Sequence, residues 1–383
     1  MVLLPRKMNT TALKIILLQK AIDELVTSNL EALEQEELVS QDCERVYGKI
    51  SQKLEELKNV SILVTGGSGF LGSWIAELVN HMNTFHNKNI KLFLLDRDSE
   101  RFETNLKHIS KSNMIEFIEC DIRSISDLPN EVNYIIHGAA PQDRRFLSSS
   151  PLETMNSICD ATSAILHSAA RLSNLVKFIN ISASYIYQDE AEEKISLLSE
   201  GLPLDLKPSN AHSEAKRYSE MLGSAARSEM RIPVITVRPF TFCGAYQDIN
   251  SPWALNNFIK DSLNKRPIKI LGDGATIRSY MYGADFAAWT ILILLTGKIG
   301  NIYNLGSDCG ISLRELAEKV SRFSKFSPEI LLNSSLTGSV KNTILVPDMK
   351  QVFDEFGLTH LTDIDIAIDR TIKWYELGFS NIS

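Results

Sequence analysis

Short apolar runs alternate with longer amphipathic segments along most of the chain. From residue 59 onward, β-type runs are separated by segments whose apolar positions recur at helical spacing. The runs predict strands at Val60–Thr65, Ile90–Leu95, Ile115–Cys120, Tyr134–His137, Val176–Ile181 and Pro233–Val237. The segments between them predict helices at Leu71–His81, Ser99–Ser110 (with Ser99 as its N-cap), Pro151–Leu172 and Asn210–Arg227. Repeated β-α units predict an α/β fold with a doubly wound parallel (Rossmann) sheet, whose ligands lie at the carboxyl ends of the strands.

The pattern changes on either side of this region. Residues 1–58 carry two successive helical patterns, which predict an N-terminal helical extension that packs on the body or on a second subunit. After Pro239 the predicted elements are irregularly spaced, and Ser312 with Glu315 forms a capping-box signature. We therefore predict a helical extension (1–58), a Rossmann domain (59–240) and a smaller α/β cap (241–383), with part of 280–310 returning to the Rossmann domain.

Composition narrows the classes of partner. The net charge of −7 argues against nucleic acid or an anionic membrane as the main partner. The five cysteines form no C-x-x-C pair and no histidine cluster accompanies them, so we expect reduced thiols and no metal site. The apolar stretch Ala12–Leu18 is too short for a bilayer span, and no signal-peptide cleavage pattern follows it. These features predict a cytoplasmic protein.

The stretch between the first strand and the first helix carries the clearest chemistry. Gly66, Gly69 and Gly72 have the spacing G-x-x-G-x-x-G. In such a stretch one glycine permits a tight turn, one lets the backbone approach a pyrophosphate, and one lets helix pack on strand. Asp96 closes the second apolar run, near the distance expected for a residue that binds a ribose hydroxyl. The stretch therefore predicts a bound dinucleotide.

Further motifs accompany the glycines. They are Asp121-Ile122 after the third strand, Gly138-Ala139-Ala140 after the fourth, Arg238-Pro239 after the sixth, and Gly272–Tyr280 in the cap. From about Val60 to the C-terminus the chain resembles the extended short-chain dehydrogenase/reductase family, the nucleotide-sugar epimerases and dehydratases. The resemblance implies a bound NAD(H) or NADP(H), oxidation of the sugar at C4, and a cap that binds the substrate.

The resemblance also implies roles for individual residues. Asp121 and Ile122 would contact the adenine, and Arg278 would hold the diphosphate of the sugar nucleotide, for which its planar fork is suited. The other implied substrate-binding residues are Asn256 and Tyr280. The implied cofactor-binding set is Gly66, Gly69, Phe70, Leu71, Gly72, Asp96, Arg97, Asp121, Ile122, Gly138, Ala139, Ala140, Lys216 and Pro239. Asp96 favours NAD because a carboxylate repels a 2′-phosphate. The adjacent Arg97 leaves NADP as the alternative cofactor.

The chain departs from this family at its catalytic positions. The family motif Y-x-x-x-K reads His212-Ser-Glu-Ala-Lys216 here, and the family's serine or threonine is Ala183. Strand alternation predicts that Ser182 and Ser184 point away from the face of residue 183, whereas Tyr185 shares that face. In the family's dehydratases, position 185 carries the glutamate that moves a proton at C5.

Three hypotheses follow, with His212, Lys216, Tyr185 and Ser184 as the catalytic candidates. His212 replaces the tyrosine as general base, with Lys216 disfavouring its protonation. Alternatively, Tyr185 supplies the missing phenol. In the third hypothesis, the protein binds dinucleotide and sugar nucleotide without the usual C4 oxidation.

The main functional prediction is an NAD-dependent nucleoside-diphosphate sugar epimerase or 4,6-dehydratase that acts through a 4-keto intermediate. The lost glutamate favours epimerase or oxidoreductase chemistry over dehydration. By resemblance, the helices near 151–172 and 210–227 would pair with those of a second copy, which predicts a homodimer with further contact from the N-terminal arm.

Overall fold

The computed structural model describes residues 10–141, 144–187, 194–199, 201, 206–333 and 343–378. Its centre is a seven-stranded sheet in the order β11-β6-β5-β4-β1-β2-β3, in which every neighbouring pair is parallel. The strands are β1 (Ser61–Thr65), β2 (Lys91–Asp96), β3 (Ile115–Glu119), β4 (Tyr134–His137), β5 (Lys177–Ile181), β6 (Val234–Pro239) and β11 (Ile302–Leu305). The predicted doubly wound sheet is confirmed.

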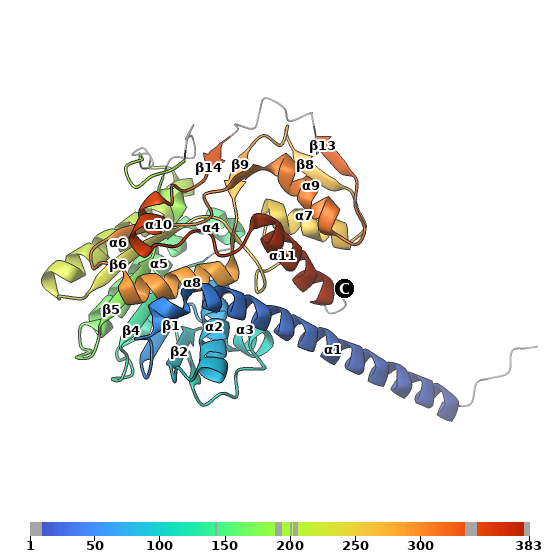
Figure 1. The fold of residues 1–383 in the computed structure, drawn as a ribbon, viewed down its shortest axis with the longest axis horizontal. Coiled ribbons are helices and arrows are strands. Elements are labelled where there is room, and N and C mark those ends of the chain that lie inside the picture. Colours follow the sequence, from blue (N-terminus) through green and yellow to red (C-terminus); the bar gives the residue numbers. More distant parts are fainter. Residues whose placement is uncertain are drawn as a thin grey trace, which may run out of the picture.

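Helices cover both faces of this sheet (Figure 1). The α-helices are α1 (Thr10–Ile50), α2 (Phe70–His86), α3 (Ser99–Asn105), α4 (Arg144–Ser149), α5 (Pro151–Ala169), α6 (Ala211–Glu229), α7 (Ala254–Leu263), α8 (Gly283–Thr296), α9 (Leu313–Phe323), α10 (Lys350–Phe356) and α11 (Ile364–Gly378). Short 3₁₀ helices are η1 (Ser51–Leu54), η2 (Ile122–Ser124), η3 (Ser184–Ile186) and η4 (Pro208–Asn210).

Strand alternation divides the core between the two faces. In β1, Ile62 and Val64 belong to the core that also contains residues of α2 and α8, whereas Leu63 packs into the core formed with α5 and α6. Both faces of the strand are therefore buried, which explains why it reads as a continuous apolar run. The first of these cores continues into α1 and α11, so the N- and C-terminal helices belong to the body of the fold.

The elements that follow β6 build the region over one end of the sheet (Figure 1). Their small sheets pair β7 with β10, β8 with β13, and β9 with both β12 and β14. These strands are β7 (Phe242–Cys243), β8 (Ile268–Leu271), β9 (Ile277–Ser279), β10 (Met281–Tyr282), β12 (Gly310–Ser312), β13 (Ile330–Asn333) and β14 (Ile344–Leu345). Within this part of the chain, α8 and β11 return to the large sheet.

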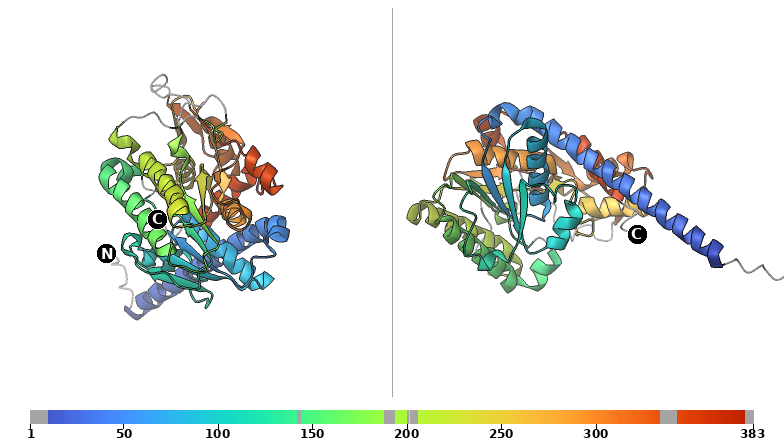
Figure 2. Two further views of the ribbon diagram at one scale, coloured as in Figure 1. Left: turned by 90° about the vertical axis from the view of Figure 1, so that its left-hand side faces the viewer. Right: turned by 90° about the horizontal axis from the view of Figure 1, so that it is seen from below.

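The N-terminal segment forms one helix of 41 residues instead of two helical runs. The second half of α1 packs on α2, α8 and α11, and its first half extends away from the body (Figures 1 and 2). Val39, Val46 and Ile50 are buried in that packing, whereas Leu30 and Leu33 are exposed. None of the helices in the described ranges combines the length and the hydropathy that a transmembrane span requires.

Two predicted helix caps have different outcomes. Ser312 and Glu315 form the expected reciprocal capping box at the start of α9. The N-cap of α3 is Asp98, whose carboxylate accepts a hydrogen bond from the Arg101 amide, so the prediction of Ser99 is wrong by one position. Both are good caps, but Asp98 has the non-helical backbone that lets its side chain reach back to the first turn.

A buried carboxylate fastens α1 to the body. Asp42 is fully buried, accepts a hydrogen bond from Tyr282 Oη at 2.6 Å, and pairs with Arg45 at 2.7 Å and Arg370 at 2.5 Å. These partners come from α1 itself, from β10 and from α11. Because both arginines and the phenol face one carboxylate, removing it would leave buried polar groups without compensation.

We expect Asp42→Ala to lower the free energy of unfolding by about 3 kcal/mol, since the guanidinium of Arg370 and the phenol of Tyr282 lose their acceptor. Glu37→Ala, at an exposed position on the same helix, is the control and should change it by less than about 0.5 kcal/mol. Urea denaturation followed by circular dichroism measures both values. Equal effects of the two substitutions would contradict the anchoring role of Asp42.

Candidate active site

A cavity of about 690 Å³ opens at the carboxyl ends of the central strands. Its wall combines the glycine stretch after β1 with the ends of β2, β4, β5 and β6, the start of α6, and residues of the cap. The crevice between β1 and β4 is where the strand order reverses, because β2 and β3 lie on one side of β1 and β4 to β6 on the other. This is the position at which open α/β sheets bind their ligands.

The glycine stretch has the geometry that its sequence predicts. Gly66 has φ +76°, and a Cβ at this position would lie 3.2 Å from the backbone of Ala139. A Cβ at Gly72 would lie 2.6 Å from the carbonyl oxygen of Gly66, so this glycine allows α2 to pack against the turn. Gly66 and Gly69 line the cavity, whereas Gly72 lies behind them and supports the turn.

The start of α2 is suited to bind an anion. Gly69 is its N-cap, and no side chain caps the first amides. These amides lie at the positive end of the helix dipole, beside Phe70 and Leu71, which also line the cavity. The loop and the helix start therefore fit the pyrophosphate of a dinucleotide, and Gly66, Gly69, Phe70 and Leu71 would hold it.

Asp96 ends β2 and faces the same cavity. Its Oδ2 accepts hydrogen bonds from the amide and hydroxyl of Ser68 at 3.1 and 2.8 Å, and its Oδ1 accepts one from the Arg97 amide at 2.7 Å. The carboxylate is thereby fixed beside the glycine loop, where a ribose would lie. Sequence reasoning missed Ser68, although a hydroxyl inside a glycine turn is a readable signal for such a contact.

Asp121 and Ile122 line the far end of the cavity together with Arg97. The Arg123 guanidinium bonds both carboxylate oxygens of Asp121, which lowers the pKa of that carboxyl to about 2. Arg123 also pairs with Glu153 on α5 at 2.7 Å. Gly138, Ala139, Ala140 and Pro239 complete this wall.

The segment after β5 differs from the prediction. The strand ends at Ile181 and the chain turns into η3 at Ser184, so the two-residue alternation stops there. Ser182, Ala183, Ser184 and Tyr185 all line the cavity. Ala183 still has an extended backbone, and the 3₁₀ turn begins only at Ser184. That Ser182 and Ser184 face away from the side of residue 183 stays a prediction.

His212 and Lys216 lie one turn apart at the start of α6, and both line the cavity. The His212 ring packs edge-on against Tyr185, with 6.1 Å between ring centroids. Lys216 Nζ donates to the Ile181 carbonyl at 2.8 Å. Burial lowers the pKa of Lys216 to about 8, although Glu220 acts in the opposite direction. The structure thus brings together all four catalytic candidates, His212, Lys216, Tyr185 and Ser184.

His137 lies behind this wall and supports it. Its ring is buried between the hydroxyls of Thr65 at 2.8 Å and Thr162 at 3.2 Å. Burial, reinforced by the Lys216 ammonium, lowers its pKa to about 3, so the ring stays neutral. Thr65 also accepts hydrogen bonds from the Gly138 and Ala139 amides. His137 and Thr65 therefore position the loop after β4.

The three predicted substrate-binding residues do not all lie in the cavity. Asn256 and Tyr280 line the cavity, whereas Arg278 does not. The Arg278 guanidinium instead donates to the backbone and hydroxyl of Thr343, at 3.0 and 2.8 Å. Arg278 lies on β9, which pairs with β12 and β14, so its sheet position directs it to this neighbour.

An aromatic stack in the cavity wall was not foreseen from the sequence. Phe70 at the start of α2 stacks on Phe242 with 4.5 Å between ring centroids, and Phe242 stacks on Phe286 at 5.3 Å. Phe70, Phe242 and Phe286 come from α2, β7 and α8, and all three line the cavity. No periodic signal marks Phe242, because it lies in a strand of two residues.

This arrangement agrees with a comparison against known families. Residues 62–306 match the model of the NAD dependent epimerase/dehydratase family. The chain belongs to this family. The match runs from β1 to the end of β11 and so contains both the glycine loop and the His212–Lys216 segment.

Two curated relatives each resemble more than two thirds of the chain. The chain is 27% identical over 330 residues to a trifunctional UDP-glucose 4,6-dehydratase, 3,5-epimerase and reductase of Arabidopsis thaliana, covering 83% of this chain and 47% of that protein. It is 30% identical over 278 residues to dTDP-D-glucose 4,6-dehydratase of Dictyostelium discoideum, covering 69% and 62%. The chain thus spans about half the length of the first curated relatives that it matches.

The fold itself is shared with solved structures. The UDP-glucuronic acid 4-epimerase of Bacillus cereus, solved with UDP-glucuronic acid and NAD, superposes with a TM-score of 0.70 at 21% identity. The match covers 83% of this chain and 99% of that one.

We expect Gly66→Ala to lower the free energy of unfolding by about 2 kcal/mol, because alanine is strained at positive φ and its methyl group meets the Ala139 backbone. Gly48→Ala is the matched control: a Cβ there meets no atom within 4 Å, and alanine favours the helix by about 0.5–1 kcal/mol. Urea unfolding distinguishes the two. If Gly66→Ala were as stable as Gly48→Ala, the close contact at the turn would be disproved.

Proposed function

We propose that the protein binds NAD and a nucleoside-diphosphate hexose and modifies the sugar through a 4-keto intermediate, as an epimerase or 4,6-dehydratase. The observation that carries this proposal is the continuous cavity, whose wall runs from Asp96 past Lys216 and His212 to Asn256 and Tyr280. UDP- and dTDP-sugar dehydratases among the relatives support the substrate class. The proposal names the class of substrate and specifies neither the nucleobase nor the hexose.

We propose NAD rather than NADP as the cofactor. The Asp96 carboxylate is fixed by Ser68 at the place where a ribose would lie, and it would repel a 2′-phosphate. Lys216 would donate to ribose hydroxyls, since its ammonium lies in the cavity wall. When bound, the nicotinamide ring supplies the hydride acceptor for oxidation at C4.

His212 is the proposed general base. A neutral imidazole can accept the proton of the 4-hydroxyl group as hydride leaves C4, and later return it. Lys216, one helical turn away, is buried, and burial lowers its pKa to about 8. The Tyr185 ring packs against His212, and Ser184 precedes Tyr185 in the cavity wall, so we propose that both hydrogen-bond the sugar.

A second candidate function is binding without redox chemistry. It is favoured by Ala183, which lines the cavity where the family carries a hydroxyl group, and by the absence of a phenol at position 212. In this case the same cavity would hold both ligands without turning them over. Tyr185 in place of the dehydratase glutamate also makes dehydration the less favoured enzymatic reaction.

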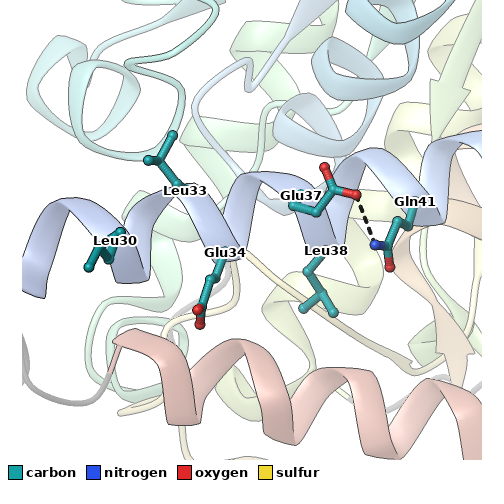
Figure 3. Close-up of a pocket in the computed structure, with 6 residues that line it drawn as sticks. All are labelled: Leu30, Leu33, Glu34, Glu37, Leu38 and Gln41. Atoms are coloured by element: carbon teal, nitrogen blue, oxygen red, sulfur yellow. Dashed lines mark hydrogen bonds between the residues drawn. The ribbon is translucent and has the colours of Figure 1, made fainter.

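We propose a homodimer in which α5 and α6 pair with their copies. These helices pack side by side, and Leu152, Met155, Tyr218 and Met221 expose large apolar side chains from them. The projecting half of α1 would add contact through Leu30 and Leu33, which line a shallow groove with Leu38 (Figure 3). A cytoplasmic location is proposed as well, supported by five cysteines that form no disulfide.

We expect Asp96→Ala to weaken NAD binding about tenfold and to leave NADP binding unchanged or tighter, because only the 2′-hydroxyl loses an acceptor. Glu100→Ala removes the same charge from an exposed neighbouring position and is the control. Calorimetric titration with each cofactor gives the ratio of affinities. An equal loss for both cofactors would refute the assigned role of Asp96.

We expect the wild-type protein to convert at least one sugar in a panel of UDP-, dTDP-, GDP- and CDP-hexoses, as followed by product NMR. His212→Phe should then lower kcat about 10²- to 10⁴-fold with a small change in KM, since the proton acceptor is lost. Tyr185→Phe, which keeps the ring contact, shows whether the phenol contributes.

His212→Tyr is the complementary variant because it restores the family motif with Lys216 in place. We expect it to retain turnover. Tight binding of sugar nucleotides without turnover in the wild type, with turnover gained in His212→Tyr combined with Ala183→Thr, would favour the binding protein over the enzyme.

A further inference from the structure

A cluster of two imidazoles and a carboxylate joins α1 to α2, away from the cavity. His81 and His86 lie in the last two turns of α2, and Glu44 lies on α1. His81 Nε2 is 2.8 Å and His86 Nε2 is 3.5 Å from the same atom, Glu44 Oε2. None of the three residues lines the candidate active site.

The ion pair between His81 and Glu44 does not explain the position of the second imidazole, His86. His86 Nε2 is shielded from solvent and makes no hydrogen bond within the described part of the chain, although it faces Glu44 Oε2. One carboxylate oxygen thus meets two ring nitrogens, and only His81 forms a hydrogen bond with it. A cation placed among the three donors would satisfy all of them.

The spacing of the donors suits a metal ion. Each residue offers one donor atom, and these atoms all lie within 4.8 Å of one another. In a tetrahedral zinc site with bonds near 2.1 Å, donor atoms lie roughly 3.4 Å apart. The His86–Glu44 distance already matches this value, and the His81–Glu44 distance needs to open only slightly. Glu44 can make that movement because its side chain is 61% exposed.

The two imidazole rings are packed against aromatic side chains. The rings are held in place: Tyr47 stacks on His86 with 3.9 Å between centroids, and Phe85 packs on His81 at 4.8 Å. Little reorganisation is therefore needed for binding.

We propose that Glu44, His81 and His86 bind a divalent transition metal ion, with Zn²⁺ as the preferred occupant. Two imidazoles and one carboxylate form a donor set that zinc accepts, and water would complete the coordination on the exposed side of Glu44. Coordination through His81 Nε2 requires the neutral ring to carry its proton on Nδ1 instead of donating it to Glu44. The ion would crosslink α1 to α2 and so tie the N-terminal arm to the dinucleotide-binding part of the fold.

A second cluster, Asp308, Cys309 and His360, provides an internal control. This cluster offers one imidazole where the site on α1 and α2 offers two, and its Cys309 is exposed. This cluster should bind zinc more weakly than the site on α1 and α2.

The test uses the full-length protein without a histidine tag, dialysed against chelator and then titrated with zinc at buffered free concentrations. Bound metal is measured by mass spectrometry, and thermal unfolding is followed in parallel. Glu44→Gln and His86→Gln remove one ligand each at positions that are not fully buried, and His360→Gln is the control. Circular dichroism and NAD binding verify that each variant is folded.

We expect one zinc ion per chain in the wild type and in His360→Gln, with a raised midpoint of unfolding. In Glu44→Gln and His86→Gln the zinc affinity should fall about tenfold or more, and the zinc-dependent shift of the midpoint should disappear. Replacement of zinc by Co²⁺ should give the visible spectrum of a tetrahedral site without a thiolate band. Unchanged zinc binding in both ligand variants, loss of binding in His360→Gln, or a thiolate band would overturn the proposal.

Discussion

The close contact of backbone with backbone at the end of β1 is the constraint on which the site depends. Gly66 turns the chain with a positive φ against the loop after β4, and Gly72 lets α2 pack directly on that turn. A side chain at either position would separate β1, β4 and α2. Because these elements form the crevice at the reversal of strand order, the same contact fixes the place of the cavity and points the start of α2 into it.

Several polar groups around this crevice hold neighbouring loops and side chains in place. Thr65 and His137 hold the loop after β4, and Ser68 holds Asp96. Lys216 donates to the end of β5. The proposed catalytic residues His212 and Tyr185 come from α6 and η3 and line the same cavity. The residues that would hold a dinucleotide are therefore supported by contacts within the fold.

Much of this could be predicted from the sequence, for identifiable physical reasons. Buried parallel strands read as apolar runs, so β4 was located to the residue and β1 to within one position. The glycine spacing predicted the loop because few other residues tolerate the positive φ of Gly66. Asp96 was found because it ends the second apolar run. The alternation rule cannot be applied beyond Ala183, because a 3₁₀ turn begins at Ser184 and no local pattern announces that change.

Other features depend on contacts between distant segments. Arg278 bonds Thr343, 65 residues away, because β9 pairs with β14, and the sequence around Arg278 does not reveal that pairing. The Glu44, His81 and His86 cluster forms because α1 packs on α2. Glu44 precedes His81 by 37 residues in the sequence, so no local spacing reveals the cluster. The arm was predicted as two successive helical runs, yet the backbone continues as a single helix from Thr10 to Ile50.

The most direct test of the central claim is a structure of the protein bound to NAD and a UDP- or dTDP-hexose. We expect the pyrophosphate to lie on the Gly66–Gly72 loop and the sugar 4-hydroxyl to lie about 3 Å from His212, next to nicotinamide C4. A sugar 4-hydroxyl out of hydrogen-bond reach of both His212 and Tyr185 would contradict it.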